Sequence, residues 1–111
     1  MPARMHRRRI ALGQKTVDLD THRIAGDGRE VCLTPTENTL LEYLVSRLNR
    51  TVPSEDLVRA VWGDAEGKGV HSLRVFIKTL RKKLEPVPAK PRYLVTEPRI
   101  GYRLQHRVGN S

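Results

Sequence analysis

The sequence predicts a single α+β domain in which a small antiparallel sheet is followed by three helices and a C-terminal β-hairpin. Three patterns support this order. Short apolar runs separated by turn signals occupy residues 10–33, helix-start and helix-face patterns occupy residues 34–84, and two more strand-like runs lie within residues 93–104. With 111 residues, of which 38% are hydrophobic, the chain can bury one modest core.

Charge is unevenly distributed along the chain. The formal net charge is +9, yet residues 10–69 carry 7 Lys/Arg against 10 Asp/Glu, whereas residues 70–111 carry 10 against 2. A solvated charged surface would not require this segregation, but a polyanionic partner would explain it. No run approaches the roughly 20 apolar residues of a membrane span, and the chain is expected to be cytoplasmic.

The first 33 residues read as a basic arm followed by a strand meander. Residues 1–9 contain four arginines and no apolar periodicity, so we expect a flexible arm, then a domain over 10–105 and a tail over 106–111. Strands are expected near 10–12, 16–19, 23–25 and 30–33. Asp27-Gly28 predicts a tight hairpin, because both turn positions favour positive φ. Cys32, the single cysteine, is expected to be a small space-filling side chain.

Two helices are predicted next. Thr34 can cap the first, Pro35 suits its first turn, and Glu37 can return a hydrogen bond to the cap residue. Leucines at 40, 41, 44 and 48 share one face, and Asn49 fits a left-handed cap. The second helix should run from Ser54 or Glu55 to about Trp62, followed by a loop over residues 63–69.

The third helix, expected over residues 71–84, has an apolar side and a basic side. The apolar side carries Leu73, Ile77, Leu80 and Leu84, with Phe76 at its margin. The opposite side carries His71, Arg74, Val75, Lys78 and Lys82, with Thr79 and Arg81 on its flanks. Such a helix is often merely solvated or binds a membrane surface, but here the core of a small domain needs its apolar side, which disfavours the membrane.

Two strand-like runs close the domain, at residues 93–96 and 101–104, and Glu97-Pro98-Arg99-Ile100 forms the expected hairpin tip. Strands, three helices and a terminal hairpin in this order are typical of a winged helix-turn-helix. A helix fits the major groove of B-DNA, and a hairpin can reach the backbone or the adjacent minor groove. Pro98 stiffens the tip and leaves Arg99 as its only cation, so Arg99 is expected to be the contact of the hairpin.

With these motifs the chain resembles the OmpR/PhoB family of response-regulator effector domains. The residues that carry the resemblance are Leu33-Thr-Pro-Thr-Glu37, Leu40-Leu41, Val61-Trp62-Gly63, the run from Leu73 to Leu84, Pro91-Arg92-Tyr93 and Gly101-Tyr102-Arg103-Leu104. They cover roughly residues 10–104. The end of the third helix and the hairpin look closest to the potassium-responsive, KdpE-like branch.

The resemblance implies a DNA-binding surface and assigns roles within it. A third helix in the major groove gives base or phosphate contacts to Val75, Lys78, Thr79, Arg81 and Lys82. Phosphate contacts at the helix start fall to His71 and Ser72, and another to the indole N–H of Trp62, for which a purely structural role in closing the second helix is equally open. Tyr102 would support the hairpin through its hydroxyl or by packing.

The resemblance also implies partners. Family members carry an N-terminal receiver domain controlled by a sensor kinase, so this chain is either a fragment or a stand-alone effector. Binding to direct-repeat sites is expected. The loop after Trp62 can touch RNA polymerase in the family, and Asp64 and Glu66 would form its acidic tip here.

Three positions depart from the family pattern. Asn38 replaces the usual aromatic residue of the first helix, so that helix is expected to pack differently against the sheet. Pro53-Ser54 removes one expected phosphate contact from the second helix. Pro98-Arg99 stands where many members have Arg-Gly, which leaves open which side chain of the hairpin reaches the minor groove.

Other classes of function find little support. The glycines around Lys68 are too closely spaced for a phosphate-binding loop and follow a helix. The four histidines are scattered, so no metal site or cofactor is expected, and no catalytic motif is present. The open alternative is a winged-helix module that uses its basic face on an acidic protein. An RNA-binding function is weaker, because no aromatic stacking platform accompanies the third helix.

Overall fold

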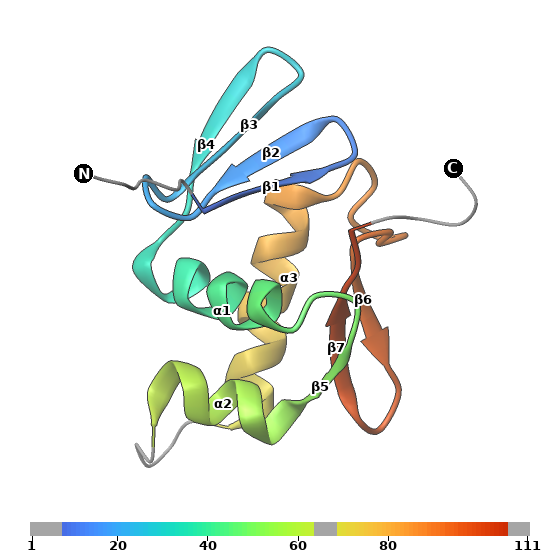
Figure 1. Cartoon of the computed structure of the whole chain (residues 1–111). Helices are drawn as coiled ribbons and strands as arrows, with labels where there is room; N and C mark the ends of the chain where they lie inside the picture. Colours follow the sequence, from blue (N-terminus) through green and yellow to red (C-terminus); the bar gives the residue numbers. More distant parts are fainter. Residues whose placement is uncertain (1–7, 64–68, 107–111) are drawn as a thin grey trace.

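A computed structural model describes residues 8–63 and 69–106 of the chain (Figure 1). The N-terminal part is a four-stranded antiparallel sheet in the order β1-β2-β3-β4. Its strands are β1 (Arg9–Leu12), β2 (Lys15–Asp18), β3 (Arg23–Gly26) and β4 (Arg29–Cys32). The predicted meander is therefore confirmed, with each boundary shifted by no more than a residue or so.

Positive-φ residues form the turns of this sheet. Asp27 and Gly28, with φ of 53° and 72°, form the predicted tight hairpin between β3 and β4. Gly13, with φ of 65°, turns the chain between β1 and β2, and a Cβ there would lie 2.0 Å from the hydroxyl oxygen of Tyr93. Glycine is thus required at residue 13 both for its conformation and for the close approach of the C-terminal segment.

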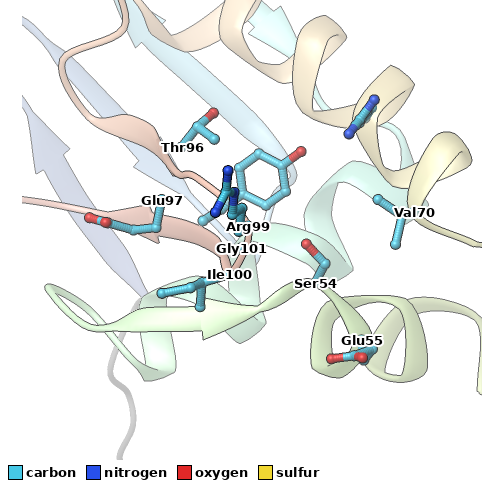
Figure 2. Close-up of a pocket in the computed structure, with 10 residues that line it drawn as sticks. Ser54, Glu55, Val70, Thr96, Glu97, Arg99, Ile100 and Gly101 are labelled. Atoms are coloured by element: carbon cyan, nitrogen blue, oxygen red, sulfur yellow. The ribbon is translucent and has the colours of Figure 1, made fainter.

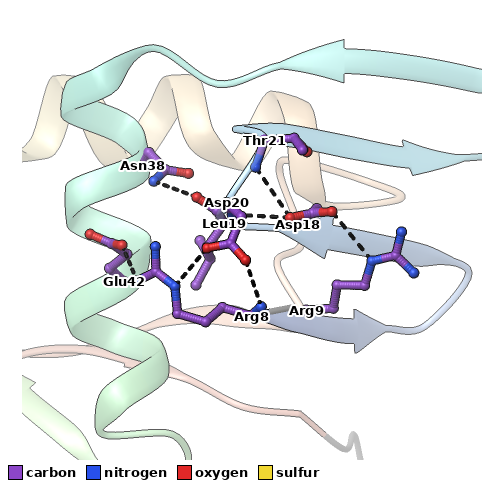
Figure 3. Close-up of polar contacts among 8 residues, drawn as sticks. All are labelled: Arg8, Arg9, Asp18, Leu19, Asp20, Thr21, Asn38 and Glu42. Carbon is purple, nitrogen blue, oxygen red and sulfur yellow. Dashed lines mark hydrogen bonds and ion pairs between the residues drawn. The ribbon is translucent and has the colours of Figure 1, made fainter. Parts of the chain in front are cut away.

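The ordered sheet begins earlier than the sequence predicts. Arg9 pairs with Asp18 as the first residue of β1, and the Arg8 carbonyl accepts a hydrogen bond from the Leu19 N–H. The Arg8 guanidinium binds Asp20 at 2.9 Å and also pairs with Glu42 (Figure 3). Residues 8 and 9 therefore belong to the fold rather than to the expected arm, whose other residues lie outside the described part of the chain.

The first helix, α1 (Pro35–Ser46), starts as predicted. The Glu37 N–H donates to the Thr34 hydroxyl, and the Glu37 carboxylate accepts from the Thr34 N–H, which completes a capping box. Asn38 is buried and donates through Nδ2 to the Leu19 carbonyl at 3.1 Å (Figure 3). The amide thereby ties α1 to the turn after β2.

The second and third helices are α2 (Ser54–Trp62) and α3 (Val70–Leu84), close to their predicted ranges. A second sheet has the order β5-β7-β6, formed by β5 (Thr51–Pro53), β6 (Leu94–Glu97) and β7 (Gly101–Leu104). The hairpin of β6 and β7 was predicted, but β5 was not. This short strand pairs antiparallel with β7 and joins the hairpin to the helices.

The core lies between the two sheets and the helices, where α3 runs through the centre of the molecule (Figure 1). The apolar side predicted for α3 is buried throughout: Leu73, Ile77, Leu80 and Leu84 are each at most 1% exposed. Cys32 is exposed, so the expectation that it fills space is wrong. Strand β4 is an edge of its sheet, and its residues are at most half-buried.

Candidate nucleic-acid interface

The exposed side of α3 carries the predicted basic set. His71, Arg74, Val75, Lys78 and Lys82 are all exposed, and Ser72 is half-buried at the helix start. Within the described residues, none of the four basic side chains in this set makes an ion pair. Val75 is 50% exposed in the middle of this surface. The helix therefore presents uncompensated positive charge around one apolar side chain.

One flank of α3 is anchored to α1. The buried Glu37 carboxylate accepts hydrogen bonds from Lys83 Nζ at 2.6 Å and from the Thr79 hydroxyl at 3.1 Å. Burial alone would raise the pKa of Glu37, but hydrogen bonds from Lys83, the Thr34 N–H and Thr79 outweigh it and lower the pKa. The Thr79 hydroxyl thus faces α1 and is already engaged, which does not favour the base contact expected for it.

Arg81 connects α3 to the C-terminal hairpin. Its Nε donates to the Leu94 carbonyl at 2.9 Å, and its Nη2 donates to the Thr96 hydroxyl at 2.8 Å. The guanidinium carbon lies 5.9 Å from the centre of the Tyr102 ring. Burial lowers the pKa of the Arg81 guanidinium, and Tyr102 and Glu85 partly offset this effect. In this structure, then, the Arg81 guanidinium, which was expected to contact a base or a phosphate of DNA, is bonded to strand β6.

Glu85 fixes the start of the same strand and was missed in the sequence. The residue is 2% exposed, and its carboxylate accepts from the backbone N–H groups of Arg92 at 2.6 Å, Tyr93 at 3.0 Å and Leu94 at 2.7 Å. The only available signal was its position, as one of two acidic residues in the basic C-terminal segment. Glu85 therefore bonds the segment leading into β6 to the end of α3.

The hairpin tip is a tight turn with an unusual residue in it. The Ile100 N–H donates to the Glu97 carbonyl at 3.0 Å, and Arg99 has φ of 68°. A turn with Pro at its second position and positive φ at its third is of type II, where glycine is normally favoured. Glu97 forms an ion pair with Arg103, whereas the exposed Arg99 forms none with any described residue and so provides the uncompensated charge of the tip.

A cleft of about 280 Å³ separates this tip from the starts of α2 and α3. Figure 2 shows Ser54 and Glu55 of α2 on one side and Val70 of α3 on another. The hairpin residues opposite them are Thr96, Glu97, Arg99, Ile100 and Gly101. Arg74 and Tyr102 also line it. Tyr102 is 7% exposed, so it supports the base of the hairpin chiefly by packing.

Trp62 lies at the end of α2, half-buried against the core. Its ring is 5.6 Å from that of Phe76, at an interplanar angle of 57°. This packing fits the structural role considered for Trp62. Asp64 and Glu66, expected at the tip of the following loop, lie outside the described residues.

Other kinds of site find no support within residues 8–63 and 69–106. That part of the chain contains no group of three or more His, Cys, Asp or Glu side chains that could hold a metal ion. Nor does it contain a helix long and apolar enough to cross a bilayer.

Comparisons with known proteins point to one family. The family model described as "Transcriptional regulatory protein, C terminal" matches residues 28–104. The transcriptional regulatory protein KdpE of Mycobacterium tuberculosis is 43% identical over 90 residues, which is 81% of this chain and 40% of that protein. KdpE of Escherichia coli K12 is 41% identical over 94 residues, 85% of this chain and 42% of the relative. The chain thus spans less than half the length of these relatives.

Solved structures agree on the fold. The response regulator DrrB of Thermotoga maritima, an OmpR/PhoB homologue, superposes with a TM-score of 0.76 at 25% identity, covering 87% of this chain and 44% of that one. The RstA DNA-binding domain of Klebsiella pneumoniae, solved in complex with the RstA box, gives a TM-score of 0.74 at 24% identity, covering 90% and 99%. A basic helix and a hairpin tip on a winged-helix fold, together with these similarities, identify the chain as a member of the OmpR/PhoB-type family of C-terminal DNA-binding effector domains of response regulators.

Proposed function

We propose that this domain binds duplex DNA sequence-specifically, with α3 in the major groove and the tip of the β6–β7 hairpin at the adjacent minor groove. The observation that carries the proposal is the exposed basic side of α3, which forms no ion pair with the described residues, while the rest of the helix is fixed by the core and by Glu37. A helix held in this way can enter a groove without rearranging. The chain would therefore act by binding and not as an enzyme.

Roles within the surface follow from exposure and chemistry. Arg74 and Lys78 project from the middle of α3, so they are assigned to base edges, where guanine N7 and O6 accept from basic side chains. Val75, half exposed beside them, fits the 5-methyl group of thymine. His71, Ser72 and Lys82 lie at the two ends of the helix and are assigned to phosphates.

Three further residues of the expected surface receive supporting roles. Tyr102 and Trp62 stabilise the base of the hairpin and the end of α2, respectively, by packing, and the half-buried Trp62 can add a contact to a phosphate. Thr79 is assigned to holding α3 on Glu37. Arg99 is assigned to the minor groove, because an arginine is favoured where that groove is narrow and A·T-rich.

Salt dependence tests the proposal directly. If about 4–7 phosphates are contacted per domain, the logarithm of the binding constant should fall against the logarithm of salt concentration with a slope of about −4 to −6. The measurement is a titration of labelled duplex, single-stranded DNA and RNA of one sequence across a salt series. A nearly flat slope, or equal affinity for all three nucleic acids, would refute duplex recognition and favour a module that binds an acidic protein.

A pair of substitutions at Arg99 separates its charge from its backbone strain. Both Arg99→Ala and Arg99→Gly should weaken duplex binding by about 1–2 kcal/mol, more on A·T-flanked than on G·C-flanked sites. Only Arg99→Gly should also raise the free energy of unfolding, by about 0.5–1 kcal/mol, because glycine adopts φ of 68° without steric strain. Competition binding on both flanks and urea denaturation provide the two readouts.

The comparison of the two variants decides the function of Arg99. Equal weakening of binding, with a stability gain for glycine alone, means that the strained residue is kept for its contact with DNA. Wild-type affinity in both variants on both flanks would show instead a solvated arginine at the tip. Arg99→Lys is the conservative control, since it keeps the positive charge but loses the planar fork.

The wider context is proposed from the relatives. The chain is assigned to a cytoplasmic two-component regulator in which a receiver domain and a sensor kinase control the effector, as the resemblance to KdpE-type regulators suggests. Binding to direct repeats about one helical turn apart would pair two copies on DNA. Contact with RNA polymerase is assigned to the loop over residues 63–69.

A further inference from the structure

A second basic groove lies at the opposite end of α3 from the cleft shown in Figure 2. It has a volume of about 310 Å³ and lies between β2–β4 of the N-terminal sheet and the last turn of α3. Four basic residues line it: Lys15, Arg29, Lys82 and Lys83. Ile24 and Val31 contribute its apolar wall, and Asp27 is its one acidic lining residue within the described part of the chain.

The shape of the sheet creates this groove. Figure 1 shows the hairpin of β3 and β4 extending past the C-terminal end of α3. Gly26, near the end of β3, keeps the strands close, because a Cβ there would lie 2.7 Å from the Gln14 carbonyl oxygen and 2.9 Å from Lys15 Cγ. A glycine within a strand often marks a place where a backbone or a ligand approaches closely. The groove is thus a feature of the folded sheet and not of a mobile loop.

The charges of the groove differ from those elsewhere on the sheet. Arg8, Arg9 and Arg23 form ion pairs with Asp20, Asp18 and Glu30, respectively. In the groove, Lys83 is bound to Glu37, but among described residues no ion pair or side-chain hydrogen bond involves Lys15, Arg29 or Lys82. Three unpaired cations against one carboxylate leave this groove ready for an anion.

The groove is continuous with the surface assigned to DNA. Lys82 lies on the same stripe of α3 as His71, Val75 and Lys78, at helical spacings of three and four residues, and it also lines the groove. A 15-residue helix is about 22 Å long. The tip of the β6–β7 hairpin, which is the wing of the fold, faces the start of α3 across the cleft, so the groove lies roughly that far from the wing tip. The recognition surface therefore leads along α3 from the wing tip at one end to the groove at the other.

We propose that this groove binds a backbone phosphate of the duplex. The phosphate would lie beyond the C-terminal end of α3, which is the end away from the wing tip. The inference rests on the proposed function and extends its footprint by one or two phosphates. Lys15 and Arg29 of the sheet, with Lys82 of α3, supply the positive charge, and no base edge is read there. The sheet would then take part in DNA binding together with the helices and the wing.

The test compares two arginines on neighbouring strands. Arg29→Gln and Arg23→Gln remove one positive charge each, both from exposed positions, but only Arg29 lines the groove. Arg29→Gln should reduce the magnitude of the salt slope by about 1, so that raising the salt concentration from 50 to 200 mM weakens its binding about fourfold less than it weakens wild-type binding. Arg23→Gln should leave the slope unchanged, and Lys15→Gln combined with Arg29→Gln should reduce it by about 1–2.

Duplex length supplies the second readout. Duplexes are shortened stepwise from either end, and the wing end is identified as the one where Arg99→Gly changes the preference for A·T pairs. Wild type should lose affinity when the opposite end is trimmed, and the Lys15/Arg29 double variant should not. Equal slopes for Arg29→Gln and wild type, or equal effects of Arg29→Gln and Arg23→Gln, would overturn the inference while wild-type duplex binding still upheld the proposed function. Failure of wild type to bind duplex would refute both.

Discussion

Replacing Glu85 by alanine should lower the free energy of unfolding by about 3–5 kcal/mol. The carboxylate is 2% exposed and accepts from the N–H groups of Arg92, Tyr93 and Leu94. Its removal leaves these donors without an acceptor at a site that water reaches poorly, and each buried unsatisfied donor costs about 1–3 kcal/mol. Urea denaturation followed by circular dichroism measures the loss.

The isosteric substitution Glu85→Gln distinguishes hydrogen bonding from packing. One carboxylate oxygen accepts from Arg92 and Tyr93 and the other from Tyr93 and Leu94, so an amide must direct an NH₂ group toward an N–H. We expect Glu85→Gln to lose about half as much stability as Glu85→Ala. Wild-type stability in Glu85→Gln would mean that Glu85 stabilises the fold through the volume of its side chain and not through the hydrogen bonds of its carboxylate.

The parts of the fold that follow from local chemistry were predictable. The capping box of Thr34 and Glu37 and the Asp27-Gly28 hairpin each depend on residues close in sequence, and each is present as predicted. The two sides of α3 followed from a 3.6-residue period, which fixes the direction of each side chain once a helix is assumed. The order of these elements, with the family motifs, then indicated a winged helix.

Features that depend on distant partners were not predictable. Strand β5 has three residues and exists through its pairing with β7, about 50 residues further along. Arg8 and Arg9 read as part of a charged arm, yet Asp18, Asp20 and Glu42 order them. Nor does the sequence show that β4 is an edge strand, which is why Cys32 is exposed.

The flanks of α3 were the hardest positions of the candidate site. A helical period places Thr79 and Arg81 at the border between the buried and exposed sides, where either direction is possible. The buried Glu37 carboxylate turns Thr79 toward α1, and acceptors on β6 turn Arg81 toward the hairpin. Both acceptors come from other elements of the chain, so the direction could be known only from the folded structure.

Replacing Arg81 by alanine should weaken duplex binding by about 1–3 kcal/mol by releasing the wing and not by removing a base contact. Arg81 is the residue of α3 that binds both the Leu94 carbonyl and the Thr96 hydroxyl of β6. Without it, the relative placement of recognition helix and wing is less restricted, and ordering the wing on DNA costs conformational entropy. The measurement is affinity for sites varied at each base pair and at both flanks, using protein shown to be folded.

Two further variants distinguish a residue that positions the wing from one that reads a base. Arg81→Lys keeps the charge but cannot span both acceptors as the planar guanidinium does, so its loss should approach that of alanine. Thr96→Val removes the bond between Arg81 and the Thr96 hydroxyl and should give a smaller loss of affinity. That loss should be confined to the preference between A·T-flanked and G·C-flanked sites. A base-reading arginine would instead make Thr96→Val silent and relax the preference at one major-groove base pair.

The decisive comparison is a double-mutant cycle between Arg81→Ala and Arg99→Gly. If Arg81 acts by placing the wing, the contact of Arg99 is already weakened in Arg81→Ala, and the two losses should fall short of additivity by about 1 kcal/mol. If Arg81 reads a base in the major groove, it acts independently of the wing tip and the losses should add. Because Arg81 already binds two acceptors on β6, reading a base would require it to break those bonds first, and this cost favours the coupled outcome.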